Sequence, residues 1–168
     1  MSLKKIYVYP EEVLRGQSEA VAEIDGEIKT LSEDMLQTMY HGIGIGLAAP
    51  QIGVQKRVIV VDVSEDGKQP MVLINPEIIE KEGIVRSDEG CLSVPGFREI
   101  VNRNKQVLVR AVDIDGNPLE IEAEGLLSRC IQHEIDHLNG ILFIDHLSRI
   151  KKEMFKRWVK KQKSELSE

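Results

Sequence analysis

Apolar residues recur every three or four positions in three segments, a spacing that predicts amphipathic helices. The first segment, residues 28–42, ends at a glycine, and the second, residues 126–139, is followed by Gly140. The third, residues 148–165, mixes apolar and basic side chains. The chain is therefore expected to hold one early helix, one late helix and one basic helix at its C-terminus.

Short runs rich in β-branched residues lie between the first and second helices and predict strands. They are residues 57–63, 71–79, 105–113 and 119–125. Pro76 interrupts the second run, and Asp115-Gly116 between the last two is a hairpin signal. We expect an α+β fold of mostly antiparallel sheets around the helix over 126–139, with a C-terminal helix. A chain of 168 residues is expected to form a single domain over 1–168.

Charge and composition narrow the range of functions. The formal net charge of −6 gives no electrostatic reason to expect a DNA-binding protein. No apolar run is long enough to cross a bilayer, and the N-terminus lacks a secretory pattern, so we expect a cytoplasmic protein with no membrane partner. Disulfides are rare in that compartment, so Cys91 and Cys130 are candidates for core residues, metal ligands or nucleophiles.

A glycine-rich segment, "GIGIGLAAPQ" over residues 42–51, fits the G-x-G-x-x-A form of a dinucleotide-binding fingerprint. That fingerprint requires a strand before it and a helix after it. Here the predicted order is reversed, and Pro50 follows the glycines. The segment alone therefore leaves a linker between helix and strand as the simpler interpretation.

The segment "QHEIDH" indicates a metal site. His133 and His137 are four residues apart, so on a helix their imidazoles share one face, and Glu134 lies beside them. Two surface histidines are the alternative, but the apolar residues before the motif predict a buried helix, where unliganded histidines are costly. The remaining histidines, His41 and His146, are expected at helix ends or on the surface.

A third ligand is needed, and the sequence leaves more than one candidate. The extended pattern of a metal-dependent peptidase continues to Gly140 but fails at Phe143, where a histidine should stand. Cys130 is on the same helix, and Cys91 is in a segment expected to be extended or looped. We favour Cys91, because a ligand so close on one helix would crowd the open coordination positions.

Three segments taken together resemble the signature of the peptide deformylases of the bacterial type. They are "GIGLAAPQ" (residues 44–51), "EGCLS" (89–93) and "QHEIDH" (132–137), and the likeness covers nearly the whole chain. The resemblance implies a metal-dependent hydrolase that removes the N-formyl group from the formylmethionine of newly synthesised proteins and releases formate. N-formylmethionyl nascent peptides are then the expected partners.

The resemblance also implies the metal and its ligands. Cys91, His133 and His137 would bind one Fe²⁺ per chain in the cell, and Zn²⁺, Ni²⁺ or Co²⁺ in purified protein. A thiolate with two imidazoles suits all of these ions. Glu134 would act as the general acid and base.

Further roles are carried over on the same resemblance. The Gln51 side-chain amide and the Leu92 backbone N–H would stabilise the oxyanion. The backbone at Ile45 and Gly46 would pair with the peptide as an added strand, and Cys130 would form a wall of the methionine pocket.

Around the site, the resemblance implies a set of charged partners. Glu89 would accept from the first histidine of the motif, Arg103 would pair with Asp136, and Arg98 would line the path of the substrate. Arg129 is unexpected beside an apolar pocket, and we expect it to extend to the rim.

The basic C-terminal helix, residues 149–168, has two interpretations. It is either a solvated helix packed through Ile150, Met154, Phe155 and Trp158, or a surface that docks on ribosomal RNA. Alternative functions for the whole chain are a metal-dependent peptidase or a non-catalytic, metal-stabilised peptide-binding module. Glu134 and Gln51 oppose the binding module, since neither is needed to hold a metal.

Overall fold

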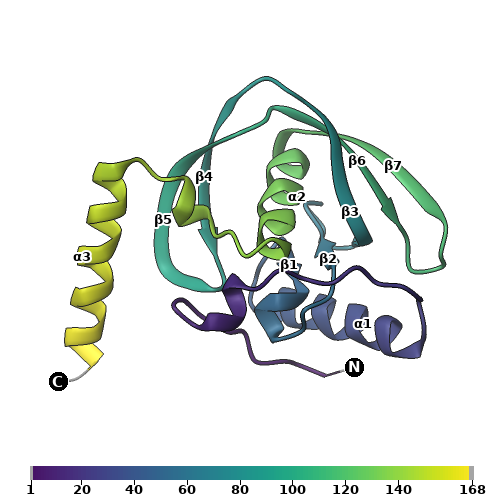
Figure 1. Cartoon of the computed structure of the whole chain (residues 1–168), viewed down its shortest axis with the longest axis horizontal. Helices are drawn as coiled ribbons and strands as arrows, with labels where there is room; N and C mark the ends of the chain where they lie inside the picture. The colour runs from purple at the N-terminus through teal and green to yellow at the C-terminus, as the bar shows by residue number, and fades with distance from the viewer. Residues whose placement is uncertain (1, 167–168) are drawn as a thin grey trace.

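The computed structural model describes residues 2–166, which fold into three α-helices and two antiparallel sheets (Figure 1). The helices are α1 (Gly26–His41), α2 (Gly125–Leu138) and α3 (Arg149–Leu166). The five-stranded sheet contains β1 (Gly46–Ala48), β2 (Val58–Val61), β3 (Met71–Glu82), β6 (Gln106–Val112) and β7 (Pro118–Glu124), and the two-stranded sheet contains β4 (Val85–Cys91) and β5 (Val94–Arg103). The expected α+β class and the C-terminal helix are confirmed. No helix among these residues combines the length and the apolar character that a bilayer crossing requires.

The five strands are ordered β1-β2-β3-β6-β7, so β1 and β7 are the edges of the large sheet. The expected hairpin joins β6 to β7, with Val112 opposite Pro118 and with Gly116 at a φ of +87° in the turn. Pro76 interrupts the pairing of its strand, as expected, but does not end the strand. β3 continues to Glu82, and a shift of register between Ile74 and Glu77 accommodates the proline, which has no N–H for the ladder.

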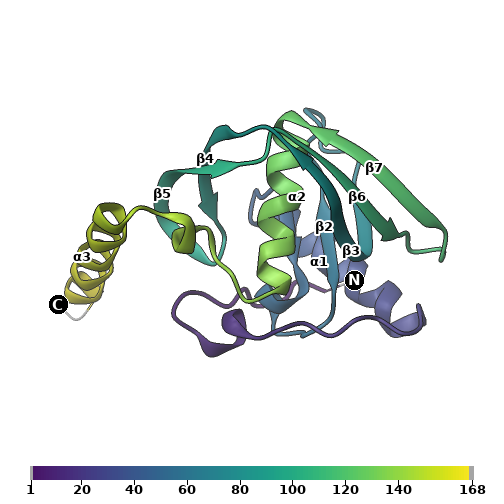
Figure 2. The ribbon, with the colours of Figure 1, turned by 45° about the horizontal axis from the view of Figure 1, so that its top comes forward.

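Both faces of β2 are buried, because the strand lies between two helices. Val58 and Val60 pack with α1, whereas Ile59 and Val61 pack with α2. This is the alternation of side chains expected along a strand. Figures 1 and 2 show α2 running through the middle of the molecule, between the large sheet and the β4–β5 sheet. The motif helix is thereby covered from both sides.

The β4–β5 sheet was not predicted as a pair of strands. The buried positions of β4 are Ser87 and Glu89, so the alternation of apolar and polar residues that marks a strand is missing there. The two strands nonetheless pair, with Ser87 opposite Val101 and, after a shift of register between Glu89 and Cys91, with Cys91 opposite Val94. Val94 and Val101 pack into a cluster with Phe143 on the far side of the motif helix. The hairpin thus carries Cys91 to α2.

The packing expected for α3 is only partly correct. Phe155 is buried, and Trp158 lies against Phe97 with ring centroids 5.3 Å apart. Ile150 and Met154, which we expected in the packed face, are 76% and 54% exposed. The helix stands at one side of the molecule (Figure 1). Its contacts with the rest of the chain run through the aromatic rings, Val159 and an ion pair between Lys151 and Glu99, and they leave the other two side chains uncovered. Residues 167 and 168 of the predicted basic helix lie outside the described residues.

Candidate active site

The two motif histidines share one buried face of α2. Gly125 begins the helix at a φ of +61°, and the helix is amphipathic with a buried side that includes His133 and His137. Their ring centroids are 5.0 Å apart. Phe143, at the position where a peptidase pattern would place a histidine, stacks on His133 with centroids 6.0 Å apart. That position therefore supplies an apolar wall to the site.

Cys91 comes to these histidines from the end of β4. Its Sγ lies 3.3 Å from His137 Nε2, and the three ligand atoms of Cys91, His133 and His137 all lie within 4.8 Å of one another. Cys130 is not part of this group. Its Sγ donates to the Ile45 carbonyl at 3.6 Å, and burial raises the pKa of its thiol, which keeps it protonated. One thiol and two imidazoles are a donor set that binds transition metals.

A buried carboxylate orients the first histidine. Glu89 Oε1 lies 2.9 Å from His133 Nδ1, which leaves Nε2 to face the ligand group. Arg103 donates two hydrogen bonds to the same carboxylate, at 2.8 and 2.7 Å. Burial of Glu89 disfavours its charged form, but the bonds from Arg103 and His133 outweigh it and lower the pKa to about 2. The expected contact between Glu89 and His133 is present, and Arg103 adds a second partner that we did not expect.

The ion pair extends from Arg103 to the surface. Arg103 Nη1 donates to Asp136 Oδ2 at 2.7 Å, as expected, and His146 Nε2 lies 2.8 Å from the same oxygen. Despite burial, the hydrogen bonds from His146 and Arg103 lower the pKa of Asp136. Sequence reasoning placed His146 at a helix end or on the surface and missed this contact. No helical spacing could have indicated this contact, because His146 ends a separate 3₁₀ helix (Phe143–His146) that a loop connects to α2.

Glu134 lies in the interior, next to the ligand group and against β1. Burial raises its pKa to about 7, and its Oε1 has no hydrogen-bond partner among the described residues. An alanine Cβ at Gly46 would meet Glu134 Cδ at 2.9 Å, so only glycine lets β1 pass this close. The site therefore contains a buried carboxyl group with a free oxygen beside three potential metal ligands.

Gln51 approaches the group from the 3₁₀ helix Ala49–Ile52. Its Oε1 accepts from the Ala48 N–H at 2.9 Å, which directs Nε2 toward Ser93 Oγ at 3.0 Å and Cys91 Sγ at 3.6 Å. Leu92 occupies the turn between β4 and β5. Ser93 is fully buried and was missed by sequence reasoning, although it stands two residues after Cys91. Its position so close to a candidate metal ligand was the signal that could have identified this serine as part of the site.

A cleft of about 660 Å³ opens onto this group. It is bounded by the glycine-rich segment, by α2 and by the β4–β5 hairpin, and its lining includes every residue expected to touch substrate: Ile45, Gly46, Gln51, Leu92, Arg98, Cys130 and Glu134. Arg98 is exposed and pairs with Asp88, with 3.4 Å between Nε and Oδ1. Because a helix precedes the glycines and β1 runs through them, the dinucleotide fingerprint is not supported.

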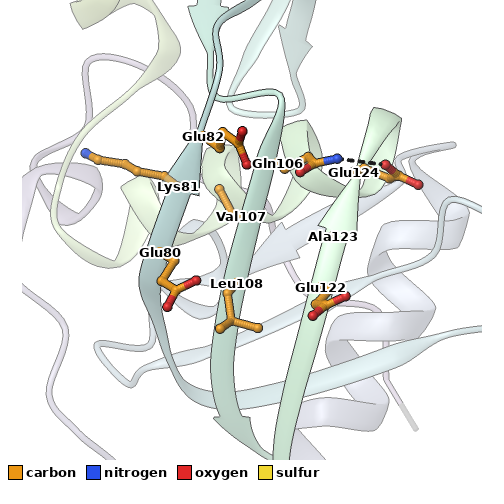
Figure 3. Close-up of a pocket in the computed structure, with 9 residues that line it drawn as sticks. All are labelled: Glu80, Lys81, Glu82, Gln106, Val107, Leu108, Glu122, Ala123 and Glu124. Carbon is orange, nitrogen blue, oxygen red and sulfur yellow. Dashed lines mark hydrogen bonds between the residues drawn. The ribbon is translucent and has the colours of Figure 1, made fainter.

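A second hollow, of about 700 Å³, lies on the large sheet over β3, β6 and β7 (Figure 3). Glu80 and Glu122 flank Leu108 there, and Glu82 and Glu124 flank Gln106. Glu124 accepts a hydrogen bond from Gln106 at 3.1 Å. Its lining holds no histidine or cysteine. Among the described residues, the group of His and Cys side chains that could hold a metal ion lies at the first cleft.

Comparisons with known proteins show the family of this chain. The profile of the polypeptide deformylase family matches residues 3–153. The peptide deformylase of Alkalilimnicola ehrlichii is 51% identical over 96% of this chain and 91% of its own length. The peptide deformylase of Thermodesulfovibrio yellowstonii is 50% identical over 97% of this chain and 100% of its own length. The crystal structure of a peptide deformylase from Legionella pneumophila is 46% identical and superimposes with a TM-score of 0.92 over 99% of this chain and 98% of its own.

A structure of the Ehrlichia chaffeensis enzyme in complex with actinonin, 41% identical, matches with a TM-score of 0.90 over 96% of this chain and 98% of its own. Sequence, family profile and fold thus agree over nearly the full chain. The protein belongs to the peptide deformylase family, the metal-dependent hydrolases that remove the N-formyl group from nascent peptides.

Proposed function

We propose that Cys91, His133 and His137 hold the metal ion of this deformylase and that Glu134 is its general acid and base. One observation carries the assignment: three ligand atoms within 4.8 Å of one another lie beside a buried carboxyl group whose Oε1 has no partner among the described residues. A site of three protein ligands is the usual form of a catalytic centre, because it leaves room for water and substrate.

Fe²⁺, one per chain, is the ion we propose in the cell. The donor set also accepts Zn²⁺, Ni²⁺ or Co²⁺, so the ion in purified protein depends on its handling. When bound, such an ion polarises the formyl carbonyl and activates water. Metal analysis of protein purified without oxygen tests the choice of ion.

Glu134 would move the proton between water and the leaving amine. Its raised pKa of about 7, caused first by burial, suits a group that must both accept and donate a proton near neutral pH. The carboxyl oxygen accepts a proton as water attacks the formyl carbon, and it returns that proton to the nitrogen as the C–N bond breaks. Formate and a free amino terminus result.

Gln51 and Leu92 would stabilise the negative charge that develops on the formyl oxygen. Gln51 Nε2 is already directed at the ligand group by the hydrogen bond of its Oε1 to the Ala48 N–H. The Leu92 N–H would act from the turn that follows Cys91. Loss of one such donor typically costs about 10²–10³ in rate.

The substrate would bind along β1, which is an edge of the large sheet and can accept another strand. Ile45 and Gly46 would supply main-chain hydrogen bonds, and Cys130 would form a wall of the pocket for the first side chain. Arg98 would stand beside the path of the peptide. Farther from the chemistry, Glu89, Arg103 and Asp136 would hold His133 and the end of α2 in position, as their hydrogen bonds support.

Glu134→Gln tests the assignment directly. We expect formate release from formyl-Met-Ala-Ser to fall by at least about 10²-fold, the usual contribution of general acid–base catalysis, while the bound metal stays at one per chain. Glu120→Gln is the matched control, because this exposed glutamate on β7 pairs only with exposed Arg110 among the described residues. Normal activity in Glu134→Gln would refute its role, and loss of metal would show that it helps hold the ion.

We also propose that α3 binds the ribosome in the cytoplasm, where nascent chains emerge. Its exposed surface combines cations with Ile150 and Met154. The triple variant Lys152→Glu, Arg157→Glu, Lys161→Glu should weaken salt-sensitive ribosome binding yet leave activity on short peptides unchanged. These side chains are exposed, so the aromatic contacts of α3 stay intact. Unchanged ribosome affinity would reject the proposal.

A further inference from the structure

One wall of the active-site cleft is a single face of α2. Leu126, Arg129, Cys130, His133 and Glu134 line the cleft, at spacings of three and four residues that place them on the same side of the helix. His133 and Glu134 are at the end where the metal ligands gather, and Leu126 is in the first turn. The wall therefore leads from the reacting centre to the open end of the cleft.

Arg129 is the cation of this wall, and its guanidinium is directed outward. Side chains on a helix tilt toward its N-terminus, which here is away from His133. Arg129 Nε indeed lies 3.5 Å from the Gly125 carbonyl oxygen, at the start of α2. The side chain is half-buried, so its methylene groups can cover the apolar pocket while its charge stays at the mouth.

Arg129 has no carboxylate partner among residues 2–166. No ion pair within 4.0 Å includes it, and its contact with the Gly125 carbonyl lies within its own helix. The other arginine of the cleft, Arg98, is engaged by both the side chain and the backbone carbonyl of Asp88. The mouth of the cleft thus offers one guanidinium that is free to bind an anion.

The geometry of an added strand determines which substrate side chain could reach it. Alternate side chains of an extended peptide point to the same face, and the first and third are about 6.8 Å apart. One turn of α2 spans about 5.4 Å. If the first side chain lies against Cys130, the third lies about one turn farther out, over Leu126 and the guanidinium of Arg129.

We propose that Arg129 is a specificity-determining residue that favours formylmethionyl chains with aspartate or glutamate at the third position. This inference rests on the proposed placement of the substrate along β1. An arginine and a carboxylate at the edge of a cleft form a charge-assisted hydrogen bond, which water and salt weaken. The effect is therefore a preference among substrates, with the chemical step unchanged.

The test compares peptides of the form formyl-Met-Ala-X-Ser-amide, with X as Glu, Gln or Lys. The amide removes the terminal carboxylate, which would otherwise compete for the arginine. For the metal-loaded protein we expect kcat/KM for Glu to exceed that for Gln by about 2- to 5-fold, the range of an exposed ion pair, and to exceed that for Lys further. The preference should shrink as salt is raised.

Three variants test whether the preference for Glu comes from the positive charge at Arg129. Arg129→Met keeps an unbranched stem and should reduce the ratio of kcat/KM for Glu over Gln to about 1, and this ratio within one variant is the quantity compared. Arg129→Lys should retain part of the preference. Arg110→Met removes the same charge from an exposed site on β6 and should keep the full preference.

Equal kcat/KM for the three peptides in the unmodified protein would overturn the inference, as would an undiminished preference in Arg129→Met. If no peptide is deformylated by a folded, metal-loaded protein, the proposed function itself fails, and the inference fails with it. The two failures are distinguished because the first still yields formate from every peptide.

Discussion

Replacing Gly46 with alanine tests how close β1 must come to α2. An added Cβ would lie 2.8 Å from Cys130 Sγ and 2.9 Å from Glu134 Cδ, distances that Cβ atoms essentially never show. Ordinary contact begins at 3.4 Å, so buried Cys130 and Glu134, which line the cleft beside β1, would have to move by about 0.5 Å or more. The backbone of Gly46 is not in the left-handed region, so the effect is one of space alone.

The expected consequences follow from that displacement. Overpacking a filled interior costs about 1–3 kcal/mol, which is the loss we expect in the free energy of unfolding. Misplacing a reacting group by about 1 Å costs about 10²-fold in rate, so a shift of half that size should lower kcat/KM by about 10-fold or more. The metal content should remain at one per chain, because the clashing atoms belong to none of the proposed ligands.

Formate release, metal analysis and urea unfolding measure these three quantities. Gly26→Ala is the matched control, because a Cβ on this first residue of α1 meets nothing within 4 Å and the backbone needs no glycine there. If Gly46→Ala had the same kcat/KM as Gly26→Ala, the close approach of β1 to Glu134 would not constrain catalysis, and our account of this glycine would be wrong.

Three further predictions concern the surroundings of the site. Arg103→Met should lower the free energy of unfolding by about 3–5 kcal/mol, because it leaves the buried charge of Glu89 without its cation. Urea unfolding of the metal-free protein measures this loss, and unchanged stability would contradict the prediction. Burial and the hydrogen bond to Asp62 raise the pKa of Tyr40 from 10.0 to about 12. The native state therefore holds this proton more tightly than the unfolded state does. The free energy of unfolding should fall as the pH rises from about 10 to about 12. In Tyr40→Phe, the free energy of unfolding should fall less over this pH range than in the unmodified protein. An equal fall in both proteins would show that Tyr40 is not the group responsible. Gly140→Ala should lower the free energy of unfolding by at least about 1 kcal/mol, because the φ of +73° favours glycine and an added Cβ would lie 2.5 Å from a backbone carbonyl oxygen. An unchanged midpoint of thermal unfolding would disprove this prediction.

The helices and most of the large sheet could be predicted because their signals are local. Apolar spacing located α1, α2 and α3 to within a few residues, and Asp115-Gly116 located the β6–β7 hairpin. The β4–β5 sheet could not be predicted in the same way, since its buried positions include the polar residues Ser87, Glu89 and Arg103, which hide the alternation that marks a strand. The exposure of Ile150 and Met154 was missed because periodicity shows that a helix has an apolar face, without showing whether anything covers it.

For the active site, the sequence alone determined the pair of imidazoles and their adjacent carboxylate, because four residues along a helix always return to the same face. It left the third ligand open between Cys91 and Cys130 until the family likeness was considered. Tertiary structure alone decided which thiol meets the histidines, since Cys91 arrives on a separate hairpin. It also decided that Arg103, besides its expected pairing with Asp136, binds Glu89 and that His146 contacts Asp136, because these contacts link separate segments of the chain and leave no periodic trace.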